Sequence, residues 1–175
     1  MKQRRAAVDA ATHKLAGLKL AEQLSMIEAW TCACTVASFM PCGSEIDTGP
    51  IDTLAREQGK HVVYPRITDD NVMTFHYWSP GQPLKRSRFG IQEPSESALE
   101  ADMSGLDLIL VPLLACDREG YRLGYGGGFY DQFLAHTRAP RFGLGFHWQL
   151  INRVPRQRHD QRISGFISEG GTTCF

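Results

Sequence analysis

The sequence predicts an α/β domain of three layers, a sandwich in which helices cover both faces of a mainly parallel central sheet. Two observations lead to this prediction. Segments rich in strand-forming residues alternate with segments of helical periodicity, a pattern typical of parallel strands joined by helical crossovers. The segment "LDLILVPLLAC" (106–116) is apolar almost throughout, as expected for a strand buried on both faces at the centre of such a sheet.

Composition limits the classes of protein to which the chain can belong. Its 175 residues are expected to form one domain over 1–175, because no linker divides them. Lys plus Arg and Asp plus Glu number 19 each, which argues against a general nucleic-acid binder. No apolar run is long enough to span a bilayer, and no apolar stretch follows the basic start as in a secretory signal. We expect a monomer that has no nucleic-acid or membrane partner.

The cysteines favour a reducing cytoplasm as the setting of the protein. They number five and include no CxxC pair, which argues against a disulfide framework and against a structural zinc site. We expect them to be small buried hydrophobes or inert thiols.

The first third of the chain predicts helix, strand and helix in turn. Residues 5–29 form one long amphipathic helix or two shorter ones, because apolar side chains recur at helical spacing at Leu15, Leu18, Leu20, Leu24 and Ile27. The short apolar run 34–40 is a strand that ends at a proline. Residues 49–59 have a helical pattern, with Pro50 suited to the first turn and Gly59 to the C-terminal cap.

The middle of the chain predicts two strands and a long connection before the central strand. Residues 61–67 form a strand. Residues 72–78 form another, antiparallel and near an edge because only a short turn precedes it. Residues 79–97 contain three prolines and no periodicity, so we expect a long surface loop, of the kind that is often functional.

The last third predicts one helix and two strands. Residues 129–137 are helical, with Asp131 in the first turn. Residues 141–148 form a strand, and 160–171 form a last strand at an edge.

The stretch "RLGYGGGFYDQF" (122–133) holds four glycines and lies beyond the carboxyl end of the central strand. In open α/β sheets of the nucleotide-binding type, ligands bind at that edge. Glycines allow positive φ angles and a close approach of the backbone, and successive N–H groups beside a helix start form an anion site. Arg122 could add a bidentate contact to a phosphate. The alternative is a flexible surface loop without a ligand.

Neither familiar phosphate-binding pattern occurs in this stretch. The Walker sequence GxxxxGK[ST] and the dinucleotide fingerprint GxGxxG are both absent. Asp131 follows the glycines, and its carboxylate could cap the helix or coordinate a magnesium ion that bridges phosphates. The residues alone leave both roles open.

Three segments in order resemble the 5-formyltetrahydrofolate cyclo-ligase family, also called methenyltetrahydrofolate synthetases. They are "GSEIDT" (43–48), "DLILVPLLACDREGYRLGYGGGFYDQFL" (107–134) and "VPRQRHD…ISE" (154–169), and the resemblance covers about residues 30–170. It implies an ATP- and magnesium-dependent ligase of one-carbon metabolism. The implied reaction converts 5-formyltetrahydrofolate to 5,10-methenyltetrahydrofolate with release of ADP and phosphate, by phosphorylation of the formyl oxygen and ring closure.

The resemblance also implies roles for particular residues. Arg122 and Tyr130 would be catalytic, and Asp131 and Asp160 would hold the magnesium ion. The ATP loop would comprise Arg122, Leu123, Gly124, Tyr125, Gly126, Gly127, Gly128, Phe129 and Tyr130. The folate would be bound by Met40, Glu45, Tyr125 and Phe129, with Trp78 and Phe89 able to close over it.

Without the family, each of these residues also has an ordinary structural interpretation. Asp160 would lie in a turn, Glu45 in a solvated loop, and Met40 and the aromatic residues in the core. The basic clusters "KRSR" (85–88) and "RVPRQRHDQR" (153–162) are either solvated faces or a source of attraction for anionic substrates.

The start of the chain departs from the family pattern. Family members carry Lys-x-x-x-Arg on a first helix, with both side chains implied to contact ATP phosphate and substrate, whereas Met1 falls inside that helix here. Lys2, Arg4 and Arg5 are nearby but do not reproduce the motif. An alternative function is therefore that of a non-catalytic relative that binds folate or nucleotide without turnover.

Overall fold

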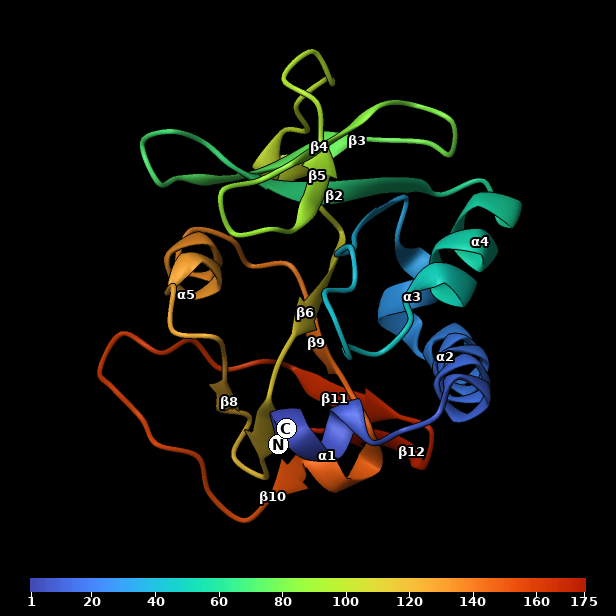
Figure 1. The fold of residues 1–175 in the computed structure, drawn as a ribbon, viewed down its shortest axis with the longest axis vertical. Helices are drawn as coiled ribbons and strands as arrows, with labels where there is room; N and C mark the ends of the chain where they lie inside the picture. Colours follow the sequence, from blue (N-terminus) through green and yellow to red (C-terminus); the bar gives the residue numbers. More distant parts are fainter.

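The computed structural model describes residues 1–175 and contains a seven-stranded sheet with the order β12-β11-β9-β6-β1-β2-β3 (Figure 1). The five inner strands are parallel, and the two edge strands, β3 and β12, are antiparallel to their neighbours. This confirms the mainly parallel sheet. The strand bounds are β1 Thr35–Ala37, β2 His61–Ile67, β3 Met73–Tyr77, β6 Leu108–Pro112, β9 Arg141–Leu144, β11 Gly165–Ser168 and β12 Gly171–Cys174.

Both faces of the sheet are covered, which confirms the three-layer prediction. One face carries the helices α2 (Ala10–Ser25), α3 (Glu28–Cys32) and α4 (Gly49–Glu57), and α5 (Phe129–Leu134) covers the other (Figure 1). Side chains of β6 alternate between two separate cores. Leu108 and Leu110 lie in the core under α2 and α4, while Ile109 and Val111 lie in the core under α5. The central strand is therefore buried on both sides.

The N-terminal helical region is divided more finely than the sequence predicts. A short helix α1 (Lys2–Ala6) precedes α2, because the Asp9 side chain caps α2 by accepting a hydrogen bond from the Thr12 N–H at 2.9 Å. Two leucines on the predicted apolar face of this helix are not buried, because Leu15 and Leu18 are 54% and 52% exposed. The buried face is formed instead by Ala16, Gly17, Leu20, Ala21 and Leu24.

Small residues explain the choice of that face. A Cβ atom at Gly17 would lie 2.7 Å from the main-chain oxygen of Asp47. The helix can therefore approach the segment before α4 closely only on its side of small residues. Helix α4 begins and ends as predicted, with Pro50 in its first turn and Gly59 just beyond its end at a φ of +73°.

Three predictions of strands and loops need correction. The segment 106–116 is divided, because β6 ends at Pro112 and Ala115–Asp117 forms β7 of a separate three-stranded sheet with β8 (Arg122–Leu123) and β10 (Leu150–Ile151). The segment 160–171 is not at the edge, because β11 pairs with both β9 and β12. The segment 79–97 is not structureless and contains a hairpin of β4 (Leu84–Arg86) and β5 (Gln92–Pro94).

All five cysteines are free, and only Cys116 is buried, so the other four are not the small buried hydrophobes of one alternative, and the second alternative, inert thiols, stays a prediction for them. None of the helices combines the length and the apolar character that a membrane span requires.

One ionisable side chain lies inside the apolar layer between α4 and the sheet. Asp52 is 6% exposed and accepts hydrogen bonds from the hydroxyl groups of Ser38 and Tyr64. Burial raises the pKa of its carboxyl group from 3.8 to about 6, although these hydroxyl groups and the charge of Arg56 partly lower it. The ionised form of Asp52 is therefore disfavoured in the folded protein.

We predict that Asp52 makes the protein less stable as the pH rises. Because its folded-state pKa lies above the ordinary value of 3.8, its stabilising contribution is complete only below that value and is lost as the pH rises through about 6. The Asp52→Asn variant does not titrate. Its free energy of unfolding should therefore rise relative to that of the wild type, by up to about 3 kcal/mol between about pH 4 and about pH 7.

Urea unfolding at both pH values measures this difference. Glu57→Gln, which removes an exposed carboxylate from the same helix, is the matched control. A difference between Asp52→Asn and the wild type that stays constant with pH would contradict the prediction.

Candidate functional site

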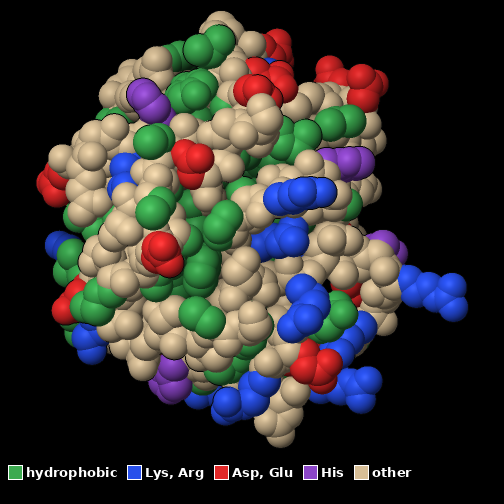
Figure 2. Space-filling model, turned by 180° about the vertical axis from the view of Figure 1, so that it is seen from behind, with side chains coloured by type: hydrophobic (Ala, Val, Ile, Leu, Met, Phe, Trp, Pro, Cys, Tyr) green, Lys and Arg blue, Asp and Glu red, His purple; other side chains and the backbone are tan.

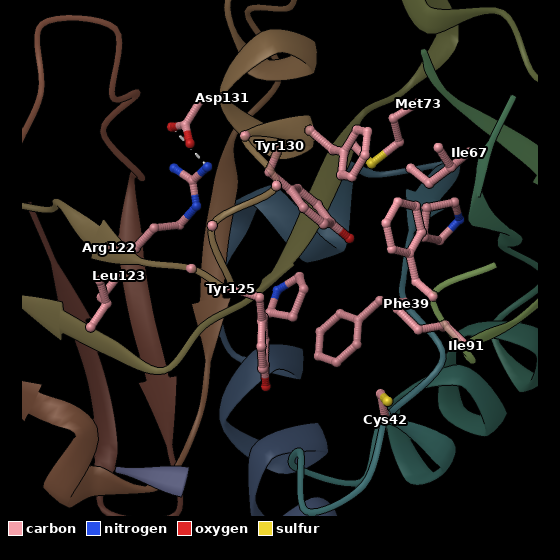
Figure 3. Close-up of a pocket in the computed structure, with 18 of the residues that line it drawn as sticks. Phe39, Cys42, Ile67, Met73, Ile91, Arg122, Leu123, Tyr125, Tyr130 and Asp131 are labelled. Carbon is pink, nitrogen blue, oxygen red and sulfur yellow. Dashed lines mark ion pairs between the residues drawn. The ribbon is translucent and has the colours of Figure 1, made fainter. Parts of the chain in front are cut away.

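A pocket of about 680 Å³ opens at the carboxyl ends of β1, β2 and β6. Phe39 follows β1, Pro65 and Ile67 lie toward the end of β2, and Pro112 ends β6, and all four line this pocket. The strand order reverses between β1 and β6, so the pocket lies at the switch point of the sheet. In Figure 3, Arg122, Leu123 and Asp131 lie on one side of it and Phe39, Cys42 and Ile67 on the other.

The glycine loop forms one wall of the pocket. Every residue of the predicted ATP loop, 122–130, lines it. Gly126 and Gly128 have φ angles of +94° and +68°, which side chains with a Cβ atom rarely adopt. A Cβ atom at Gly127 would lie 2.8 Å from the Phe129 ring. The glycines therefore allow both the sharp turn into α5 and the position of Phe129.

Arg122 and Asp131 are bound to each other at one side of the pocket. A terminal nitrogen of Arg122 lies 2.9 Å from Asp131 Oδ1, and another donates to the Gln161 carbonyl at 2.8 Å (Figure 3). The same Oδ1 accepts the Gln161 N–H at 2.9 Å. These contacts join β8, α5 and the segment before β11. Arg122 and Asp131, both predicted site residues, are thus brought together. Arg122 is 8% exposed, so the ion pair is largely shielded from solvent.

Asp160 lies beside this arrangement and also lines the pocket. Its Oδ2 accepts the Gln157 N–H at 2.7 Å, and its Oδ1 is 3.9 Å from His159 Nε2. Asp131 Oδ2 makes no hydrogen bond. Two carboxylates with oxygens to spare suit Mg²⁺, which prefers few carboxylates together with phosphate oxygens. No cluster of three or more metal-binding side chains exists in the structure.

The segment that carries Asp160 is held by a buried carboxylate that the sequence did not single out. Asp117 is completely buried, and although burial alone raises its pKa, its hydrogen bonds lower the pKa overall. The donors are the N–H groups of Glu119, Tyr121 and Val154 and the guanidinium of Arg156. Arg156 thus has a structural partner and does not belong to a purely solvated face.

Glu45 lines the pocket and is 8% exposed, so it is not the solvated loop residue of the alternative interpretation. One of its oxygens accepts the Cys42 N–H at 2.8 Å. Burial and the adjacent Glu45 carboxylate raise the pKa of the Tyr125 phenol well above its ordinary value. Glu45 and the glycine loop are therefore in direct electrostatic contact.

Tyr130 carries a buried hydroxyl group without any hydrogen-bond partner. Figure 3 shows this hydroxyl pointing into the pocket. Burial raises the pKa of the phenol far above its ordinary value, so the group stays protonated and can donate a hydrogen bond. Buried polar groups are nearly always paired, and an unpaired one inside a pocket indicates a place for a ligand atom.

Arg5 is a site residue whose role sequence reasoning did not establish. It is 4% exposed and donates to Tyr125 Oη at 2.6 Å, to the Leu113 carbonyl at 3.1 Å and to Ser44 Oγ at 3.4 Å. These acceptors are neutral, and Arg5 forms no ion pair. A second cavity of about 390 Å³ is lined by Arg5 and Lys2 and shares Cys42 and Tyr125 with the main pocket. No pattern in the sequence distinguishes Arg5 from Arg4, and Arg5 is recognised as a site residue only through its contacts with distant segments.

The remaining expected folate residues differ in position. Met40 lines the pocket, and Phe89, at the tip of the β4–β5 hairpin, packs against Phe129 with ring centroids 5.5 Å apart. Trp78 packs edge-on to Tyr64 at 5.5 Å and does not line the pocket. The hairpin therefore covers part of the pocket, whereas Trp78 packs outside it, against Tyr64 of β2.

Positive side chains gather on one side of the molecule, on the right in Figure 2. Figure 1 places α5, β8 and the segment between β10 and β11 on that side. This segment includes the exposed Arg153, Arg158 and Arg162. The side of the molecule that carries the glycine loop can thus attract anionic ligands.

Comparisons with known proteins identify the family of this chain. A family model described as the 5-formyltetrahydrofolate cyclo-ligase family matches residues 1–169. The 5-formyltetrahydrofolate cyclo-ligase of Escherichia coli strain K12 is 30% identical over 175 residues, which cover 96% of each chain. That of Mycolicibacterium smegmatis is 34% identical over 143 residues, covering 77% of this chain and 73% of the relative.

Solved structures agree as well. The NMR structure of the Aquifex aeolicus 5,10-methenyltetrahydrofolate synthetase has a TM-score of 0.83 and 26% identity, and the match covers 98% of this chain and 87% of that one. The Mycoplasma pneumoniae 5,10-methenyltetrahydrofolate synthetase, at a TM-score of 0.77 and 19% identity, covers 95% of this chain and 93% of its own, and supports the fold alone. The chain therefore belongs to the 5-formyltetrahydrofolate cyclo-ligase family, the ligases that convert 5-formyltetrahydrofolate to 5,10-methenyltetrahydrofolate with ATP.

Proposed function

We propose that this chain carries out the cyclo-ligase reaction within the pocket of about 680 Å³, with ATP on the glycine loop and the folate against Glu45. One observation carries the proposal: a single pocket is lined by both the glycine loop and the buried carboxylate of Glu45. Phosphates suit the N–H groups of the loop. A carboxylate suits the paired N–H donors at the polar edge of a pterin.

In the proposed reaction the formyl oxygen attacks the γ-phosphorus of ATP, and ADP leaves. Nitrogen 10, losing its proton, then attacks the activated carbon, and phosphate leaves as the ring closes. Positioning and charge stabilisation account for most of the catalysis in such a phosphoryl transfer. The Tyr130 hydroxyl, which lacks a protein partner, is available to donate a hydrogen bond to the oxygen that carries the transferred group.

Arg122, Asp131 and Asp160 complete the phosphate side of the site. Arg122 has N–H groups beyond those used by Asp131 and Gln161, and these can contact the transferring phosphoryl group. Asp131 and Asp160 would hold a magnesium ion, which would neutralise phosphate charge when bound. Arg5, which contacts Tyr125 of the glycine loop, would add a second positive charge beside the pocket.

We further infer that the protein acts as a cytoplasmic monomer without a nucleic-acid or membrane partner. The five free thiols support a reducing compartment.

The defining experiment measures the absorbance of the methenyl product after mixing the protein with 5-formyltetrahydrofolate and magnesium-ATP. We expect product only when ATP is present, and Arg122→Ala should lower kcat by about a hundredfold or more because a transition-state contact is lost. Arg138→Ala, an exposed arginine beyond α5, is the control. Full turnover by Arg122→Ala would refute its role. No product from folded wild-type protein that still binds both ligands would instead establish a non-catalytic binding protein.

The proposed magnesium-binding role of Asp131 and Asp160 is tested by how the activity depends on the Mg²⁺ concentration. Asp160→Asn and Asp131→Asn should each raise the half-saturating Mg²⁺ concentration at fixed ATP by about tenfold or more, because each removes a charged ligand. Asp160→Asn is the cleaner variant, since Asp131→Asn also releases Arg122. An unchanged magnesium requirement in both variants would contradict the assignment of these two carboxylates as magnesium ligands.

Arg5 is tested against its neighbour Arg4. Arg5→Gln should lower kcat/KM by about tenfold to a hundredfold, because the uncompensated charge beside the pocket disappears. Arg4→Gln removes the same charge from an exposed side chain that lies 4.4 Å above the Trp148 ring, and should change kcat/KM little. Equal losses in the two variants would reject a specific role for Arg5.

A further inference from the structure

One carboxylate on α4 connects the residue that follows β1 to the middle of the neighbouring strand β2. Asp52 Oδ1 accepts a hydrogen bond from Ser38 Oγ at 2.7 Å, and Ser38 directly follows β1. Asp52 Oδ2 accepts a hydrogen bond from Tyr64 Oη at 2.8 Å, and Tyr64 lies in β2. Ser38 is fully buried and Tyr64 is 2% exposed, so solvent does not compete for either bond.

Both hydroxyl groups belong to residues that immediately precede the wall of the pocket. Ser38 is followed by Phe39 and Met40, and Tyr64 by Pro65, all three of which line the pocket. A displacement of Ser38 or Tyr64 would therefore move that wall directly.

A further hydrogen bond fixes the same segment at its other end. Thr48, which precedes α4, donates its hydroxyl to the Phe39 carbonyl at 3.0 Å. The chain from Ser38 to Thr48 is thus tied to α4 at both ends, and Glu45 lies within it. The position of Glu45 depends on these anchors.

Arg56 completes the arrangement from the next turn of α4. It donates to Tyr64 Oη at 2.7 Å and to the Asp52 carbonyl at 3.1 Å. Its guanidinium lies 6.0 Å from the centroids of both the Tyr64 and the Trp78 rings. We call Ser38, Asp52, Arg56 and Tyr64 the α4 clamp.

A clamp of this kind is an unfavourable way to fill a core. Apolar side chains of similar volume usually stabilise such a position as well as or better than a buried charge. What a hydrogen-bonded carboxylate adds is direction, since it fixes both hydroxyl groups at one distance and angle.

We propose that Asp52 is a positioning residue for the folate side of the pocket, which holds Phe39, Met40 and Glu45 in place through Ser38 and Tyr64. This inference rests on the proposed function for its substrate. The glycine loop, in contrast, is held by Arg122 and Asp131, neither of which contacts the α4 clamp. Weakening the clamp therefore raises the KM for 5-formyltetrahydrofolate and leaves the KM for ATP unchanged.

The test uses variants that remove one hydroxyl group at a time while keeping the packing. Ser38→Ala removes the hydroxyl group that follows β1, and Tyr64→Phe removes the one in the neighbouring strand β2. Each should raise the KM for 5-formyltetrahydrofolate about threefold to tenfold, the effect of one or two lost hydrogen bonds, with less than about a twofold change in the KM for ATP. Asp52→Asn can accept only one of the two hydroxyl hydrogens, so it should raise the KM for 5-formyltetrahydrofolate by a similar factor and leave the KM for ATP unchanged.

Leu24→Ala is the stability control. Leu24 is fully buried in the same core but contacts neither strand end through a hydrogen bond, so its loss lowers stability without a shift in KM. If Ser38→Ala and Tyr64→Phe lower stability as Leu24→Ala does and leave both KM values unchanged, Asp52 is only a structural residue and the proposal is wrong. Equal rises in both KM values would also overturn it.

Amide hydrogen exchange of the free protein separates this inference from the proposed function. Exchange in segments 38–46 and 64–67 should increase in Ser38→Ala and Tyr64→Phe, relative to Leu24→Ala, while exchange in 122–131 should not. This result needs no turnover. A wild-type protein without ATP-dependent product would refute the proposed activity, whereas unchanged exchange in 38–46 would refute the clamp.

Discussion

The reversal of strand order between β1 and β6 is the constraint on which the rest of the site depends. Strand β2 is added on one side of β1, and β6, β9 and β11 on the other, so the chain leaves these strands toward opposite faces of the sheet. A crevice at their carboxyl ends is the geometric consequence. The loop after β1 brings Glu45 to it, and the residues that follow β6 bring the glycine loop. The two walls of the pocket thus come from opposite halves of the fold.

Buried charges around this crevice are compensated to different degrees, and the difference indicates their roles. Asp117 is surrounded by hydrogen-bond donors and holds a loop in place. Arg122 is neutralised by Asp131, so it is oriented before any ligand arrives. Arg5 has only neutral acceptors. Because an unpaired charge is most unfavourable in a medium of low dielectric constant, Arg5 is the group that gains most from an anionic ligand.

The same distinction applies to the two walls of the pocket. The glycine wall is positioned by charge, through the Arg122–Asp131 pair and the contact of Arg5 with Tyr125. The opposite wall is positioned by hydrogen bonds from the Ser38 and Tyr64 hydroxyl groups to the Asp52 carboxylate, whose burial raises its pKa to about 6. We expect ionisation of that carboxylate to lower stability at neutral pH, yet the same carboxylate joins the residue after β1 to the middle of β2. Stability and the placement of binding residues are therefore in tension at Asp52.

Local patterns in the sequence determined the α/β class, the parallel sheet, the antiparallel strand near residue 75 and the position of the glycine loop. Each depends on periodicity or on glycine and proline within a few residues of one another. Contacts between distant segments decided the rest. The exposure of Leu15 follows from the close approach of Gly17 to Asp47, and the place of Arg5 in the site follows from Tyr125. Such contacts join residues that are far apart in the sequence and meet only in the folded chain, so periodicity within a short segment cannot predict them.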